Sequence, residues 1–262
     1  MRLPVVLIVG LLAAAPALAA DDPLARARQL YNQGQFLPAI NEAERARLLT
    51  GRADSADLII ARAYLERFRE SGASDDLTNA RERLRRLDPT RLGPAERDEF
   101  LIGVGETLYF DNAFGAAASL FASIVDRPDP LAPDARERTL DWWATSIDRD
   151  ARARPETDRE TMFARLHDRM RDEMAARPTS SVAAYWLAAS ARSQGELQEA
   201  WDAVQAGWVR SVLAADHGEA LRTDLDDLMQ RAIIPERARA LGQPVEALRL
   251  EWERFKEKWK RG

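Results

Sequence analysis

The residues that most often carry enzyme chemistry are few in this sequence and are poorly spaced for it. The 262 residues include two histidines and no cysteine, which excludes a thiol nucleophile and a thiolate metal site. His167 lies in RLHDRMRDE and His217 in AADHGE, and neither has the H-E-x-x-H spacing of a zinc site. His167 has acidic neighbours, as on a charged helix face. His217 stands at an expected helix end, where a histidine suits the helix dipole.

Paired carboxylates and one glycine-rich stretch are the remaining candidates for catalysis. Asp21-Asp22, Asp75-Asp76 and Asp226-Asp227 are neighbours in sequence, and neighbouring side chains do not face one another on a helix. The stretch GVGETL at 103–108 begins like a phosphate loop, but it lies inside an expected helix, where Gly105 would allow close packing. Neither a G-x-S-x-G nor a Walker motif is present. We therefore predict that the chain is not an enzyme and uses no catalytic residue, cofactor or metal ion.

Composition and charge indicate an all-α chain that does not bind nucleic acid. Ala, Leu, Arg and Glu dominate, all of them strong helix formers, and no stretch alternates apolar with polar residues for long enough to suggest a sheet. The formal net charge is −5. Lys and Arg are interleaved with Asp and Glu, as on solvated helix faces. Without a basic surplus, the chain cannot neutralise a phosphate backbone.

The first residues have the pattern of a secretory signal peptide. Arg2 precedes an apolar run from Val5 to Leu12, and Ala17-Leu18-Ala19 offers small residues at both recognition positions of a cleavage site. We predict that residues 1–19 are removed; an uncleaved anchor is the alternative. No other segment is apolar enough to span a bilayer. The mature chain is expected to be exported and soluble, and periplasmic or secreted if the organism is bacterial.

A pattern of small residues recurs three times along the chain. In each copy two small residues lie twelve positions apart, a glycine or asparagine precedes the second by five, and an apolar residue precedes it by three. Antiparallel helices approach closely where small residues meet, and the turn between them needs a residue that tolerates positive φ. Pro38 suits the first turn of a second helix. The copies are Ala27, Gly34, Phe36, Ala39; Gly105, Asn112, Phe114, Ala117; and Ala188, Gly195, Leu197, Ala200.

This pattern resembles the tetratricopeptide repeat, a helix-turn-helix unit of about 34 residues that stacks into a superhelix. The resemblance is clear over residues 20–53, 98–131 and 181–214, and looser over 54–89 and 133–178. In the last of these, two long helices are expected over 133–151 and 156–177, separated by Pro155. The resemblance implies an α-solenoid of about five units over residues 20–216.

Residues 217–262 do not continue the pattern and are expected to form C-terminal capping or docking helices. The first has Leu221, Leu225, Leu228 and Met229 on one face, and a short second piece follows Pro235. The last carries an apolar stripe that we expect to cap the array, because a stacked array must cover its terminal face. The alternatives are that this stripe fills the groove or docks on a partner. It consists of Leu248, Trp252, Phe255 and Trp259.

The tryptophans are expected to be mainly core residues. Trp186, Trp201 and Trp208 stand at helical spacing, and each would bury a large apolar area. Trp142 and Trp143 are adjacent, so both rings cannot enter one core face. One of them is expected to reach a groove or a neighbouring unit.

Proteins that resemble this family mostly bind peptide segments or helices of other proteins along a concave surface, which is lined by the first helix of each unit. Arginine and tyrosine are frequent binding hot spots, although Arg28 and Arg62 could equally pair with acidic residues on neighbouring helices. The asparagine row of the family's terminal-carboxylate clamp is occupied by Arg28, Arg62 and Glu106, so that clamp is not expected. The motif positions give this candidate groove: Leu24, Arg28, Tyr31, Asn32, Leu58, Arg62, Leu65, Ile102, Glu106, Tyr109, Phe110, Tyr185 and Arg192.

The sequence therefore predicts a non-enzymatic adaptor or scaffold of the cell envelope or secreted space. Its expected partner is a protein or peptide bound in the groove of the repeat array. The alternative is a small-molecule or envelope-polymer binding protein that uses the same concavity.

Overall fold

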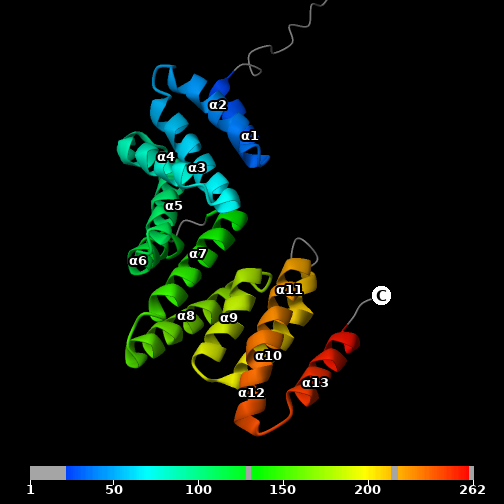
Figure 1. Ribbon diagram of the computed structural model, residues 1–262. Coiled ribbons are helices and arrows are strands. Elements are labelled where there is room, and N and C mark those ends of the chain that lie inside the picture. The colour runs from blue at the N-terminus through cyan, green and yellow to red at the C-terminus, as the bar shows by residue number, and fades with distance from the viewer. Residues whose placement is uncertain (1–21, 128–130, 214–217, 260–262) are drawn as a thin grey trace, which may run out of the picture. The chain divides into compact units, whose positions relative to one another are not determined.

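The computed structural model describes residues 22–127, 131–213 and 218–259, which are helical and contain no strand (Figure 1). The prediction of an all-α chain is confirmed for these residues. The predicted signal peptide, residues 1–19, and His217 lie outside them. Among the described helices, none combines the length and the apolar character needed to cross a membrane.

The chain divides into two compact units, residues 1–100 and 101–262, and the boundary falls within one helix. The core of unit 1 is built from alanines together with Leu24, Ile40, Ile59 and Ile60. The predicted division into a repeat domain, 20–216, and a C-terminal segment, 217–262, stays a prediction. The described helices of unit 1 are α1 (Pro23–Asn32), α2 (Phe36–Arg47), α3 (Ala53–Ser71), α4 (Ser74–Arg86), the short 3-10 helix Pro89–Arg91 and the first part of α5 (Pro94–Phe110).

Unit 2 contains the end of α5 and the remaining helices, which share one core that extends from Ile102 to Trp252. Consecutive helices pack in adjacent pairs. A first helix also contacts the first helix of the next pair, as α7 does α9 and α9 does α11. The elements are α6 (Phe114–Val125), α7 (Pro133–Ala151), α8 (Glu156–Ala176), α9 (Ser181–Ser193), α10 (Leu197–Arg210), a 3-10 turn Ser211–Leu213, α11 (Glu219–Leu228), a π-helical turn Met229–Ile233, α12 (Ile234–Leu241) and α13 (Val245–Lys258).

The three predicted helix-turn-helix turns share one backbone geometry. Gly34, Asn112 and Gly195 have φ of 72°, 61° and 81°. In each turn the next backbone N–H returns to the carbonyl five residues earlier, at 2.9 Å, 2.9 Å and 3.0 Å respectively. This bond closes the end of the first helix, because it satisfies a carbonyl that has no partner within the helix. The turn prediction is confirmed, and Pro38 lies in the first turn of α2 as expected.

Small residues lie where the paired helices approach. Ala27, Ala39, Ala188 and Ala200 are each 0% exposed. A Cβ atom added to Gly105 would lie 2.6 Å from ring atoms of Phe121 on α6, closer than side chains tolerate. The role of close packing predicted for Gly105 is therefore confirmed.

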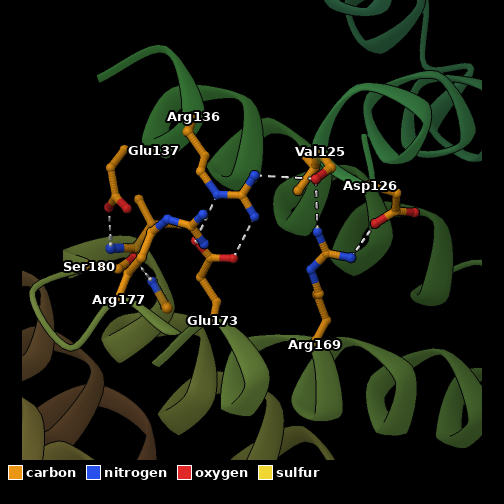
Figure 2. A network of polar contacts seen from close by, with 10 residues as sticks. Val125, Asp126, Arg136, Glu137, Arg169, Glu173, Arg177 and Ser180 are labelled. Atoms are coloured by element: carbon orange, nitrogen blue, oxygen red, sulfur yellow. Dashed lines mark hydrogen bonds and ion pairs between the residues drawn. The ribbon is translucent and has the colours of Figure 1, made fainter. Parts of the chain in front are cut away.

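A buried polar network joins α6, α7 and α8 (Figure 2). Arg136 of α7 donates Nε–H and Nη2–H to the Glu173 carboxylate of α8 at 2.8 Å and 2.7 Å, and Arg177 donates to the same carboxylate at 3.0 Å. The Val125 carbonyl, at the end of α6, accepts bonds of 3.2 Å from both Arg136 and Arg169. Since α6 has no basic residue in its own last turn, these two arginines supply the positive charge that favours a helix C-terminus.

The residue after Arg136 extends this network to α9. A carboxylate oxygen of Glu137 accepts the backbone N–H of Val182 at 3.2 Å, in the first turn of α9 (Figure 2). That turn contains no acidic residue of its own, so Glu137 supplies the negative charge that a helix N-terminus favours. Adjacent residues of α7 thus fix the ends of two other helices.

The sequence suggests that Pro235 separates two helices, but in the structure the helical path continues through it. The chain passes from α11 through the π-helical turn Met229–Ile233 directly into α12, with Pro235 as the second residue of α12. Proline lacks an N–H and its ring crowds the carbonyl four residues earlier, and a widened helical turn relieves both problems. Leu221, Leu225 and Met229 are buried along this continuous path.

The last helix, α13, covers helices of its own unit. Leu248 and Trp252 are 2% and 0% exposed. The Trp252 ring lies 5.2 Å from the ring of Trp208 on α10, and its Nε1–H donates to Asp226 of α11 at 2.6 Å. Phe255 stacks on Trp252 at 5.5 Å. The apolar stripe therefore packs on the chain itself, as a capping helix does, and only Trp259, at 41%, is largely exposed.

Candidate functional site

In unit 1 the structure brings part of the predicted groove set together around a small pocket of about 110 Å³. Arg28 bonds to Glu96 and lies 3.5 Å from Glu99, both on α5. Arg62 is buried, with its guanidinium 4.0 Å from Glu66. The interpretation that these arginines pair with acidic residues on neighbouring helices is confirmed for Arg28, whereas Glu66 lies on the same helix as Arg62, α3. The pocket is lined by Arg28, Tyr31, Asn32, Ile59, Arg62 and Glu99.

The Arg28–Glu96 pair is part of the start of α5. Burial by itself would raise the pKa of Glu96, but hydrogen bonds from Ser55 and from the Gly93 N–H, together with Arg28, hold that pKa below its usual range. Glu96 therefore stays ionised at neutral pH and closes the first turn of α5. A ligand in this pocket would meet arginines whose charge is already neutralised.

Several of the predicted groove residues lie in the core. They are closed off from solvent, so they cannot provide a contact surface in this conformation. Their exposed fractions are 8% or less, and they are Leu24, Leu58, Leu65, Ile102 and Glu106.

Two further groove residues belong to an aromatic cluster in unit 2. Tyr109 and Phe110, on α5, lie 4.9 Å and 5.7 Å from Trp142 of α7, measured between ring centroids. Trp143 is buried instead, at 4%. The prediction that one of the adjacent tryptophans reaches a neighbouring helical pair is confirmed, and Trp142 is that residue.

One cleft of unit 2 lies on successive first helices. Its volume is about 400 Å³, and α7, α9 and α11 each contribute residues that line it. We call it the first-helix cleft. It combines aromatic and aliphatic surface with carboxylates at α7 and α11. Its lining residues are Asp141, Thr145, Ser181, Val182, Tyr185, Trp186, Ala220, Leu221 and Asp224.

Burial and neighbouring carboxylates raise the pKa of two groups in the first-helix cleft. Burial and the charges of Asp141 and Asp227 raise the pKa of Asp224 above its ordinary value. Burial, followed by Asp224, Asp148 and Asp141, also raises the pKa of the Tyr185 hydroxyl. Asp141 is oriented by the Trp186 indole, whose Nε1–H donates to it at 2.8 Å. Both shifts show that the cleft disfavours additional negative charge.

The first-helix cleft contains one of the two groove residues predicted on α9. Tyr185 lines it, whereas Arg192 donates to the carboxylate of Glu236 on α12 at 3.0 Å and 3.1 Å. Sequence reasoning missed Asp141 because its helix was only a loose match to the repeat. It missed Asp224 because the pattern ends before α11, although α11 packs beside α9.

His167 is not on a charged helix face, so that interpretation was wrong. It is 4% exposed; its Nδ1 lies 3.2 Å from Ser190 Oγ and its Nε2 lies 3.2 Å from the Glu199 carboxylate. Serine, histidine and glutamate can form a catalytic set. Here Ser190 is 0% exposed and donates to the Leu187 carbonyl, so it cannot reach a substrate in this conformation.

Metal binding has no support in the described part of the chain, where no group of three or more His, Asp or Glu side chains has a suitable arrangement.

Comparison with known proteins adds no relative. No family model matches the chain. No curated protein and no solved structure matches it either. The resemblance to tetratricopeptide repeats stays a prediction, and function has to be inferred from the residues themselves.

Proposed function

We propose that this chain is a non-enzymatic adaptor of tetratricopeptide-like solenoid architecture, which binds a segment or helix of another protein. In this proposal about five helical pairs stack, and the partner lies along their first helices. The signal-like segment, residues 1–19, supports export and a role in the cell envelope or secreted space.

The observation that carries the proposal is the first-helix cleft. Its residues come from three first helices in succession, including Asp141 of α7, Tyr185 of α9 and Asp224 of α11. A segment laid across these helices would contact aromatic surface and carboxylates together, which is the mixture that anchors peptide side chains. The burial of Ser190 supports the non-enzymatic part of the proposal.

Site-specific photocrosslinking in the producing cells tests this proposal. A benzophenone side chain would replace Thr145 in the cleft, and in a matched control it would replace Ala206, an exposed residue of the second helix α10. We expect a discrete protein adduct from position 145 and none from position 206. Adducts of the same size from both positions, or from position 206 alone, would contradict binding through the cleft.

The second candidate function is binding of a small molecule or an envelope polymer. The aromatic residues Tyr185 and Trp186 in the first-helix cleft, and its volume of about 400 Å³, favour it, because small-ligand pockets span about 300–1,000 Å³. A small ligand would raise the melting temperature of the isolated chain. An adaptor would show that rise only when its protein partner is added.

A further inference from the structure

Three arginines on or next to the helices that form the first-helix cleft bond to other residues. Arg192 is held by Glu236 through two bonds to its Nε–H. Arg222, on α11, donates to Ser211 at 2.8 Å and lies over the Trp208 ring. Arg152 bonds to Asp148 at 2.6 Å. None of these arginines lines the cleft.

Asp141 and Asp224 are therefore left without a cation. Among the described residues no lysine or arginine lies within ion-pair distance of either carboxylate, and the protein contact of Asp141 is the neutral Trp186 indole. The charge of Asp141 disfavours ionisation of Asp224, and although solvent screens these exposed groups, an opposite charge between them would relieve the repulsion. The Tyr185 ring beside them offers a π face, which also attracts cations.

We propose that the first-helix cleft receives a lysine or arginine side chain of the partner segment, placed between Asp141 and Asp224 and beside Tyr185. Charge complementarity selects this occupant, since an acidic segment would add repulsion and an apolar one would leave the carboxylates desolvated. The apolar residues Val182 and Leu221 would contact the methylene groups of the same side chain. This inference rests on the proposed adaptor function and specifies its ligand.

Peptide display on the full chain tests the proposal without a known partner. Random peptides on phage would be selected against the immobilised protein, and the bound sequences would be synthesised and measured by fluorescence anisotropy. The test variant is Asp141→Asn with Asp224→Asn, which preserves shape and an acceptor for the Trp186 N–H. The control, Asp168→Asn with Asp202→Asn, removes the same charge from exposed faces of α8 and α10.

We expect the selected peptides to share a lysine or arginine at one position. Their affinity should fall at least about tenfold in the cleft variant and stay unchanged in the control. Replacing that basic residue by glutamine should weaken binding to the native chain to the same degree, with little further loss in the cleft variant.

The failing results separate the two proposals. Peptides without a shared basic residue, or equal affinity for the cleft variant and the native chain, would overturn the inference but leave peptide binding in place. Selection that enriches no peptide at all would overturn both the inference and the adaptor function.

Discussion

The Arg136–Glu173 pair shows how a single residue can control the packing of several helices. Glu173 is 2% exposed and accepts from Arg136 and Arg177. Arg136 in turn bonds the last carbonyl of α6. Removing one partner of a buried ion pair leaves the other charge buried without a counter-charge. The resulting loss of stability is larger than the contribution of the intact pair.

We predict that Glu173→Gln lowers the free energy of unfolding by about 3–5 kcal/mol. Urea denaturation at neutral pH would measure the loss. Glu160→Gln, at an exposed position on the same helix, should change stability by less than about 0.5 kcal/mol. Similar effects of both substitutions would contradict the account.

The same pair predicts a pH dependence. Burial would raise the pKa of Glu173, but the bonds from Arg136 and Arg177 hold that pKa below its ordinary value of 4.5. A lowered pKa in the folded state means that ionisation stabilises the fold above pH 4.5, and that this gain is lost as the pH falls through the folded-state pKa. The stability difference between the native chain and Glu173→Gln should therefore narrow in acid.

Asp224 should have the opposite effect on stability. Its pKa lies above the ordinary 3.8, so its ionised form is disfavoured in the folded state and costs stability at neutral pH. We expect Asp224→Asn to raise the free energy of unfolding at pH 7, by less than about 1 kcal/mol because solvent screens this exposed group. The gain should vanish once the native carboxyl is protonated. A loss of stability at neutral pH would show that Asp224 is already paired.

At the scale of elements, close approach of helices is set by small residues. We predict that Gly105→Ala destabilises unit 2 by about 1–3 kcal/mol, because the new methyl group would meet the Phe121 ring. Phe121→Leu in the same chain should recover part of that loss by making room for it. A thermal melt of the single and double variants would show the coupling. If the stability losses of the two single variants simply added up in the double variant, that result would argue against a contact between position 105 and Phe121.

The packing of α13 on other helices of unit 2 gives a second prediction at this scale. Trp252 is 0% exposed and contacts α10 and α11, so Trp252→Ala should cost about 3–5 kcal/mol. Trp259 lies two positions further along the same apolar stripe but is 41% exposed, so Trp259→Ala should cost less than about 0.5 kcal/mol. If instead Trp252→Ala left the melting temperature unchanged, α13 would not be covering the core.

The sequence predicted turns and helix bounds far better than it predicted which helices pack against one another. The turns at Gly34, Asn112 and Gly195 follow from backbone conformations that few residues adopt, and α7 and α8 were predicted nearly to the residue. The burial of His167 depends on which face of α8 meets α9 and α10, a property that a sequence of mixed polar and apolar residues leaves open. The π-helical turn before Pro235 likewise depends on the packing of Met229 and Ile233, both 0% exposed.

For the candidate site the sequence supplied Tyr185 but neither carboxylate. Asp141 and Asp224 lie 83 positions apart, as their numbers give, and only the stacking of α7, α9 and α11 places both on one cleft. No short motif contains such a pair. Arg28 and Arg192, in contrast, could be found by position but are neutralised within the chain, because their acidic partners Glu96 and Glu236 lie on other helices.

At the scale of the whole molecule, function depends on whether the first helices act together as a binding surface. The chain has no cysteine, so one introduced thiol is a unique reporter. The alkylation rate of Thr145→Cys, in the cleft, would be measured with and without the tightest-binding displayed peptide. Ala206→Cys, on the exposed face of α10, is the control.

That alkylation rate tests the central claim most directly. Binding along the first helices predicts that the peptide slows the reaction at position 145 and leaves position 206 unchanged. Unchanged rates at position 145 under saturating peptide, or protection at position 206 instead, would contradict it.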